Sequence, residues 1–157
     1  MKETILMIDD DMDDIHLVEE AFSQINKEIV VNYQTNGEKI IEYLSNLPDH
    51  PDIILLDLNM PKKNGKEVLK EIKSNPRFAD IPVVIFTTSI SESDRKECFQ
   101  LKANSVVSKP ALFNYWQILL ESLCAIFLRS CASIQNKNSI DQQGKSMKPN
   151  NAPDTQK

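Results

Sequence analysis

Residues 5–11, Ile-Leu-Met-Ile-Asp-Asp-Asp, place three acidic residues directly after a short apolar run. Residues 53–57, Ile-Ile-Leu-Leu-Asp, repeat the pattern with one acidic residue. A short apolar run is typical of a buried parallel strand, and open parallel sheets bind ligands just beyond the carboxyl ends of their strands. We therefore expect Asp9, Asp10 and Asp57 to meet at one edge of a sheet.

Carboxylates gathered in this way favour a bound cation. Two unit charges roughly 4 Å apart repel each other by about 4 kcal/mol at an effective dielectric constant near 20. A cation among them offsets that cost, and a ligand set made only of oxygen suits a hard divalent metal. The sequence therefore predicts a Mg2+ site.

Apolar runs of strand length alternate with segments of helical period along the chain. The predicted strands are Thr4–Ile8, Ile29–Tyr33, Asp52–Leu56, Val83–Phe86 and Ser105–Val107. Five helices fit between and after them, the fourth from about Glu92 to Leu101 with Ser91 as its cap. This order predicts an α/β fold with a doubly wound, five-stranded parallel sheet and right-handed crossovers.

Length and composition limit the classes of protein. A chain of 157 residues fits one folded domain, which we place at residues 1–132, and the polar residues 133–157 are expected to be a disordered tail. The net charge of -5 gives no general attraction to nucleic acids or anionic membranes. Cys98, Cys124 and Cys131 are odd in number and widely spaced, which favours a reduced, cytoplasmic location.

The last predicted helix is the most apolar. Polar residues such as Asn114 and Glu121 interrupt the stretch Leu112–Leu128, so a membrane span is not expected. Ile118 and Ile126 lie partly off the face that would pack on the sheet. Two interpretations stay open: a broad core helix, or an exposed apolar strip for a partner or a second copy of the chain.

Residues at four strand ends together point to a family. Asp9 and Asp10 follow the first predicted strand, Asp57 the third, Thr87 the fourth and Lys109-Pro110 the fifth. In this order they resemble the receiver domain of two-component response regulators, over about residues 3–129. The segment Leu55–Lys63 is similar to single-domain receivers associated with bacterial phytochromes. The resemblance implies a flavodoxin-like sheet of strand order 2-1-3-4-5.

The resemblance also implies roles for the site residues. Asp57 would accept a phosphoryl group on its carboxylate. Asp10, Asp57 and the backbone carbonyl of Asn59 would bind Mg2+ directly, and Asp9 would hold metal-bound waters. Lys109 would contact the phosphoryl group as a point charge, and Thr87 would donate its hydroxyl to it.

Other positions receive simpler assignments. Asp11 is predicted to cap the first helix, and Asp13 and Asp14 are assigned only to its positive end, without a catalytic role. His16 is expected at the surface of the first helix, and His50 in a loop.

Three further expectations come from the resemblance. Pro110 is expected to follow a cis peptide. Val106 stands where many receivers have an aromatic residue, so the usual coupled movement of threonine and aromatic ring is in doubt. Ser89 and Asn59 occupy positions that tune the hydrolysis of the acyl phosphate in this family.

The expected function is signalling rather than metabolic catalysis. A sensor histidine kinase or a histidine phosphotransfer protein would donate the phosphoryl group, and the switched surface, around the fourth and fifth helices, would contact a downstream protein that the sequence does not identify. No DNA-binding domain fits into the polar residues after the last helix, and a homodimer through that helix is a further expectation.

Rival interpretations are weaker. A phosphatase of the haloacid dehalogenase type needs a second aspartate two residues after the nucleophile, where Asn59 stands. A flavodoxin-like flavin protein needs a phosphate-binding loop rich in Ser, Thr and Gly after the first strand, which is absent. A degenerate receiver that is never phosphorylated is disfavoured because Asp10, Asp57, Thr87 and Lys109 are all present.

Overall fold

The computed structural model describes residues 2–25 and 28–129, so the predicted tail and Cys131 lie outside the described residues. Within them the chain alternates regularly between strand and helix. The elements are β1 (Glu3–Ile8), α1 (Met12–Ile25), β2 (Ile29–Gln34), α2 (Ile40–Asn46), β3 (Ile53–Leu56), α3 (Gly65–Ser74), β4 (Val83–Thr87), α4 (Glu92–Gln100), β5 (Ser105–Ser108) and α5 (Phe113–Phe127).

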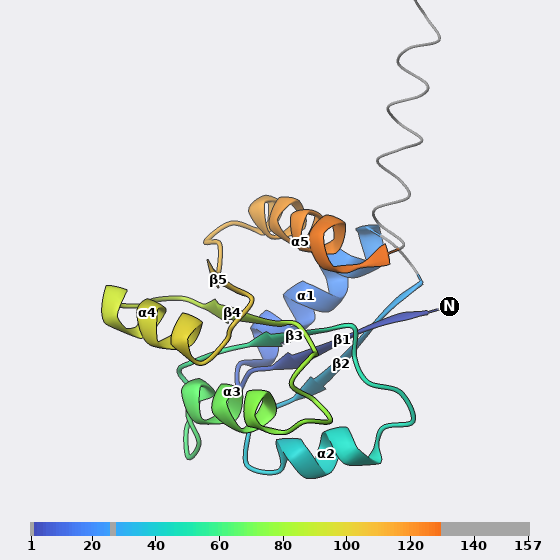
Figure 1. The fold of residues 1–157 in the computed structure, drawn as a ribbon. Coiled ribbons are helices and arrows are strands. Elements are labelled where there is room, and N and C mark those ends of the chain that lie inside the picture. The colour runs from blue at the N-terminus through green and yellow to red at the C-terminus, as the bar shows by residue number, and fades with distance from the viewer. Residues whose placement is uncertain (1, 26–27, 130–157) are drawn as a thin grey trace, which may run out of the picture.

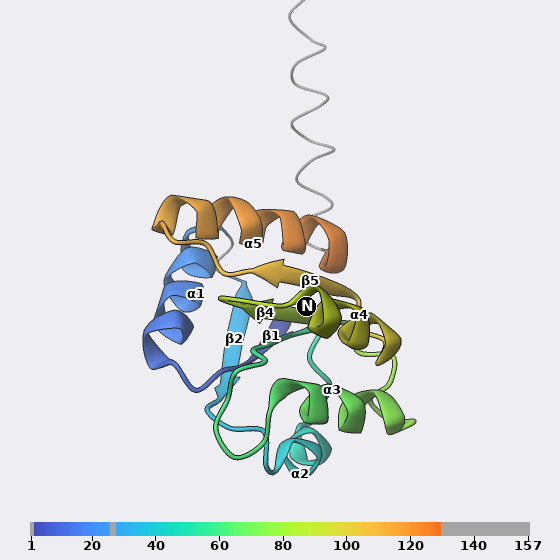
Figure 2. The same cartoon turned by 90° about the vertical axis from the view of Figure 1, so that its left-hand side faces the viewer.

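The strands form one parallel sheet of order β2-β1-β3-β4-β5, which confirms the predicted fold. Helices cover both faces of this sheet: α1 and α5 lie on one side, and α2 and α3 on the other (Figures 1 and 2). Each predicted strand is present, with ends that differ by at most one residue.

Burial on both faces explains why the strands read as continuous apolar runs. In β1, Ile5 and Met7 point to the α1 and α5 side, whereas Leu6 and Ile8 point to the opposite side. The residues of β3 divide in the same way and are all buried.

Strand register aligns the ends that carry the acidic residues. Ile8 pairs with Leu56 in the parallel ladder, so Asp9 and Asp57 leave the sheet at the same level. The backbone amide of Asp57 donates to the carbonyl of Ile8 at 2.9 Å. The convergence of Asp9 and Asp57 is therefore a result of sheet pairing.

Side-chain caps begin several of the helices. The Asp11 carboxylate accepts from the amide of Asp13 at 2.9 Å, as expected for a cap of α1. The predicted Ser91 cap of α4 is confirmed by its bond from the Asp94 amide. Asn64 and Glu67 form a capping box that fixes the start of α3.

The expected cis peptide before Pro110 is wrong, because that peptide is trans. The trans form is the lower in energy for X–Pro bonds by roughly 0.5–1 kcal/mol, and the described loop accommodates it.

His16 is exposed on α1 and His50 lies in a loop, as expected. Cys98 and Cys124 are buried. Among the residues that the structure describes, no helix is long and apolar enough to cross a membrane.

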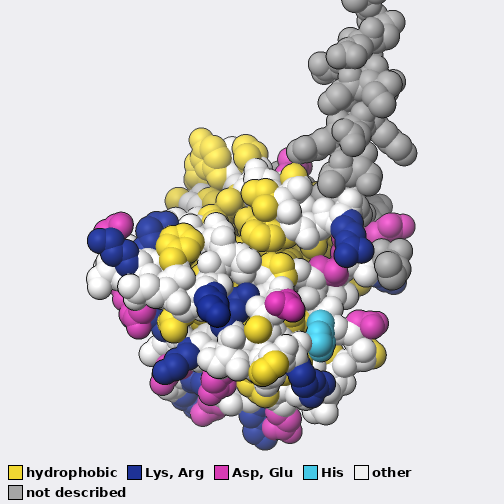
Figure 3. Space-filling model, in the orientation of Figure 1, with side chains coloured by type: hydrophobic (Ala, Val, Ile, Leu, Met, Phe, Trp, Pro, Cys, Tyr) yellow, Lys and Arg dark blue, Asp and Glu magenta, His cyan; other side chains and the backbone are white. Residues whose placement is uncertain are grey.

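Helix α5 packs with one face and exposes the other. Trp116, Leu120 and Leu123 are buried, whereas 58% of Ile118 and 70% of Ile126 is exposed. Hydrophobic side chains gather over this helix in the upper part of Figure 3. The helix is thus more than a core element, and an apolar strip reaches solvent.

The start of α3 presses against the backbone that carries Asp57. A Cβ atom added at Gly65 would lie 2.2 Å from the carbonyl oxygen of Asp57 and 2.7 Å from Cα of Leu58. Both contacts are with backbone, so relief requires α3 or the Asp57 segment to move. Only glycine fits here, because the helix approaches the site so closely.

We expect Gly65→Ala to lower the free energy of unfolding by about 1–3 kcal/mol, since overlap with backbone outweighs the better helix propensity of alanine. Urea denaturation measures the change. Lys70→Ala, at an exposed position of α3, is the control and should leave stability nearly unchanged. Equal midpoints for the Gly65 variant and the unmodified protein would contradict the close approach.

Candidate functional site

Three carboxylates meet where β1 and β3 end. Asp9, Asp10 and Asp57 each offer an oxygen that lies within 4.8 Å of those of the other two. Asp9 and Asp57 are buried, with 1% and 5% of their surface exposed, whereas Asp10 is exposed. The group is therefore anchored in the protein and opens to solvent through Asp10.

Lys109, from the end of β5, supplies the positive charge that faces this cluster. Its Nζ atom lies 2.5 Å from a carboxylate oxygen of Asp9, 2.8 Å from one of Asp14 and 3.8 Å from one of Asp57. Only 5% of the lysine side chain is exposed. Burial alone would lower the pKa of Lys109, but the bonds to Asp14 and Asp9 raise it above its ordinary value, so the ammonium stays charged.

Asp9 shows the cost of burying a carboxylate at this site. Burial raises its pKa from 3.8 to about 6, although the bond to Lys109 and the amide of Asp11 act in the opposite direction. The Lys109 ammonium therefore does not fully offset the burial of the Asp9 carboxylate, to which the charge of Asp57 adds a smaller effect. A divalent cation with oxygen ligands fits the remaining negative charge, and Mg2+ is the ion that this donor set suits.

Thr87 lies at the end of β4 and is completely buried. Its hydroxyl oxygen accepts from the side-chain amide of Asn59 at 3.1 Å, and the hydroxyl lies 3.5 Å from the carbonyl of Ser89 as a donor. The amide of Lys109 donates to the carbonyl of Thr87 at 2.9 Å. The structure thus joins the loops after β3 and β4 to the end of β5 through Thr87.

Asp14 is the residue that sequence reasoning missed. It was assigned only to the positive end of α1, but its carboxylate makes a direct ion pair with Lys109. Helical spacing offered one indication, because Asp14 lies four residues before the buried Val18 and so on the border of the packed face. Nothing in the sequence indicated Lys109 as the partner.

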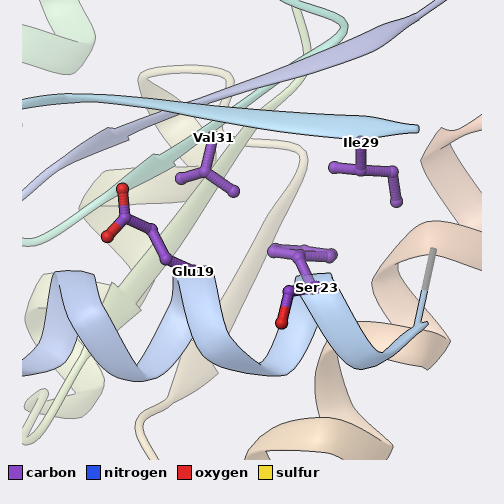
Figure 4. Close-up of a pocket in the computed structure, with 5 residues that line it drawn as sticks. Glu19, Ser23, Ile29 and Val31 are labelled. Atoms are coloured by element: carbon purple, nitrogen blue, oxygen red, sulfur yellow. The ribbon is translucent and has the colours of Figure 1, made fainter. Parts of the chain in front are cut away.

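A pocket of the described residues lies away from the acidic cluster. It has a volume of about 340 Å3 and is lined by Glu19, Phe22, Ser23, Ile29 and Val31, between α1 and the first half of β2 (Figure 4). The carboxylates follow the opposite, carboxyl ends of the strands. The chemistry of the acidic cluster therefore does not depend on this pocket.

Taken together, the cluster can hold a hard cation, present a carboxylate oxygen as a nucleophile and offer an ammonium to an incoming anion. Asp9 and Asp57 both lie in the acidic group and face Lys109, but the Lys109 ammonium is 2.5 Å from Asp9 and 3.8 Å from Asp57, so Asp57 is the less engaged of the two. Carboxylates act as nucleophiles toward phosphorus in enzymes that form acyl phosphates.

Comparison with known proteins agrees with this arrangement. The family model of the response regulator receiver domain matches residues 5–116. The response regulator Rcp1 of Synechocystis sp. is 38% identical over 112 residues, which span 67% of this chain and 75% of that protein.

Solved structures show the same fold. The phosphorylated cyanobacterial phytochrome response regulator RcpA is similar with a TM-score of 0.76 and 34% identity, over 83% of this chain and 96% of that one. The Mn2+-bound form of Rcp1 is similar with a TM-score of 0.72 and 31% identity, over 81% of this chain and 95% of that one.

The raised pKa of Asp9 predicts a pH dependence of stability in the metal-free protein. The folded protein keeps the Asp9 proton up to about pH 6, whereas the unfolded chain releases it near 3.8. The resulting stability is fully present below about pH 4 and is lost as the pH rises through about 6. At about 1.4 kcal/mol per pKa unit, the loss amounts to roughly 3 kcal/mol.

Urea denaturation with a chelator, carried out from about pH 4 to pH 7, measures this loss. Asp9→Asn removes the titrating group, so we expect its free energy of unfolding to rise relative to that of the unmodified protein across this range. Parallel curves for the two proteins would show that the pKa of Asp9 is not raised.

Proposed function

The chain belongs to the response regulator receiver domain family, and we propose that it accepts a phosphoryl group on Asp57 from a phosphohistidine donor, with Mg2+. The observation that carries the proposal is the position of the Asp57 carboxylate, buried beside Asp9 and Asp10 and 3.8 Å from the Lys109 ammonium. In the transfer, an oxygen of Asp57 bonds to phosphorus as the bond from phosphorus to the donor nitrogen breaks.

We assign the metal ligands to the acidic cluster. Asp10, Asp57 and the backbone carbonyl of Asn59 would bind Mg2+ directly, and Asp9 would hold its waters. Support comes from the spacing of the three carboxylates and from the Mn2+ bound by the similar Rcp1. When bound, the ion would neutralise charge on the transferring group.

Lys109 and Thr87 would recognise the phosphoryl group. The Lys109 ammonium would approach a phosphoryl oxygen, and the Thr87 hydroxyl would turn from Ser89 to donate to another. A switch from 1:99 to 99:1 needs about 5.5 kcal/mol of preference for one state, which a few charge-assisted bonds can supply.

Helix α4 is joined by polar contacts to α3 and to β5, two elements that border the site. Lys66 of α3 pairs with Asp94 at 2.8 Å and Glu97 at 2.6 Å, and Arg95 donates to the carbonyl of Val106 in β5 at 3.4 Å. Since Val106 is aliphatic, the movement of Thr87 would pass to α4 and β5 through these polar contacts rather than through an aromatic ring. The switched surface would then include α4 and also α5, because the indole of Trp116 in α5 donates to the carbonyl of Pro110, the residue after Lys109.

The partners follow from the chemistry. A sensor histidine kinase or a histidine phosphotransfer protein would donate the phosphoryl group in the cytoplasm, and the similar RcpA is a phytochrome response regulator that has been phosphorylated. A downstream protein would bind the switched surface. Turnover of phosphomonoesters is disfavoured, because the amide of Asn59 is bonded to Thr87 where the phosphatase interpretation needs a carboxylic acid.

Incubation with acetyl phosphate and Mg2+ tests the phosphoryl acceptor. Intact-mass measurement should show the addition of one phosphoryl group, because Asp57 is the proposed nucleophile of the site. We expect Asp57→Asn, or removal of Mg2+ with a chelator, to abolish the addition. Asp49→Asn, at an exposed loop position, should react like the unmodified protein. If Asp57→Asn gained a phosphoryl group to the same extent as the unmodified protein, the acceptor would be another residue.

We also propose that the exposed strip of α5 pairs with a second copy of the chain when Asp57 is phosphorylated. Ile118 and Ile126 point away from the core, and burial of such side chains stabilises a dimer. Helices α4 and α5 would lie in or beside this contact, which would couple it to the switch.

Light scattering measures this assembly. We expect a dimer in the presence of acetyl phosphate and Mg2+, and at least roughly tenfold weaker association for Ile118→Asp, which places a charge in the contact. Glu121→Ala, an exposed position on the same helix, is the control. If the unmodified protein stayed monomeric both with and without acetyl phosphate and Mg2+, the dimer would be ruled out.

A further inference from the structure

We propose that Asp14 is a positioning residue that holds the Lys109 ammonium away from Asp57 and competes with the phosphoryl group for it. This inference rests on the proposed function. It assigns to Asp14 a control over how readily Asp57 is phosphorylated and how long the phosphoryl group persists.

Geometry gives the first argument. Lys109 lies 2.5 Å from Asp9 and 2.8 Å from Asp14, but 3.8 Å from Asp57. Two of the three N–H donors of the ammonium therefore point to the carboxylates of Asp9 and Asp14. In this state the charge that should meet the phosphoryl group is already engaged.

Asp14 differs from Asp9 in its relation to the metal site. The carboxylates that converge closely enough to share an ion are those of Asp9, Asp10 and Asp57, and Asp14 is outside that group. A cation bound there would draw on the negative charge of Asp9. Asp14 has no such competitor, so it would remain the carboxylate that opposes the transfer of Lys109 to the phosphoryl oxygen.

Lys109 can change partner only through its side chain, because its backbone is fixed on both sides. Its amide donates to the carbonyl of Thr87 at 2.9 Å, and the indole N–H of Trp116 donates to the carbonyl of Pro110 at 2.8 Å. Asp14 is fixed as well, since it belongs to the first turn of α1. The competition is therefore between two anchored anions for one long side chain.

The released Asp14 carboxylate would not be left buried without a partner. Its side chain is 17% exposed, against 1% for Asp9, so water can replace the ammonium. Replacing the Lys109 ammonium at Asp14 by water thus has a moderate free-energy cost. Such a cost suits a residue that tunes how Lys109 divides between Asp14 and the phosphoryl group.

Asp14→Asn tests the assignment, with Asp13→Asn as the matched control. Asp13 is the adjacent residue in the first turn of α1 and is exposed. We expect Asp14→Asn to be phosphorylated by acetyl phosphate about three- to tenfold faster and to lose the phosphoryl group more slowly, the range that one partly exposed ion pair supplies. Asp13→Asn should match the unmodified protein, and Asp14→Glu should restore slow phosphorylation.

A double-mutant cycle with Lys109→Met separates positioning from a general effect of charge. If Asp14 acts through Lys109, Asp14→Asn should have no effect on the rate of labelling or of phosphoryl loss in the Lys109→Met background. A similar acceleration in both backgrounds would overturn the positioning role. Urea denaturation verifies that the variants are folded.

The outcomes distinguish this inference from the function on which it rests. An unmodified protein that takes up no phosphoryl group would refute the phosphoryl acceptor itself. An unmodified protein that is labelled on Asp57, together with an Asp14→Asn variant that is labelled at the same rate or more slowly, would refute only the role of Asp14.

Discussion

The burial of neighbouring carboxylates at the ends of β1 and β3 is the constraint on which the rest of the site depends. Asp9 and Asp57 are buried at neighbouring strand ends, where water screens their charges poorly. The ammonium of Lys109, which directly follows β5 and lies 100 residues after Asp9 in the sequence, pairs with the buried Asp9. Because the negative charge of the carboxylates exceeds the positive charge of Lys109, the site suits a cation. With a cation in place, it also suits an anion.

This arrangement requires a parallel sheet with both faces covered. Parallel register brings the carboxyl ends of β1, β3, β4 and β5 to the same edge, so residues from distant parts of the chain converge there without a dedicated loop. The helices on both faces exclude water from the strands and hold the strand ends in place. The close approach of α3 at Gly65 extends this support to the backbone of Asp57 itself.

The fold and the convergence of Asp9, Asp10 and Asp57 could be predicted because each has a local pattern. Apolar runs marked the strands, and the acidic residues after them marked the cluster. The partner of Asp14 could not be predicted in this way, because residues 14 and 109 meet only after the sheet has formed and α1 packs beside α5, near the loop that follows β5. The hydrogen bond between Asn59 and Thr87 could not be predicted either, because these residues also meet only in the folded protein. The isomer of the peptide before Pro110 depends on the tertiary structure of the loop after β5.

Trp116 gives the molecule an optical property that follows from its position. It is the only tryptophan of the chain. Its ring packs edge-on against Phe86, the residue before Thr87, with the ring centres 5.1 Å apart, and its N–H group bonds the residue after Lys109. The indole therefore touches the neighbours of both groups that would respond to phosphate, and its intrinsic fluorescence should report their rearrangement without any added dye.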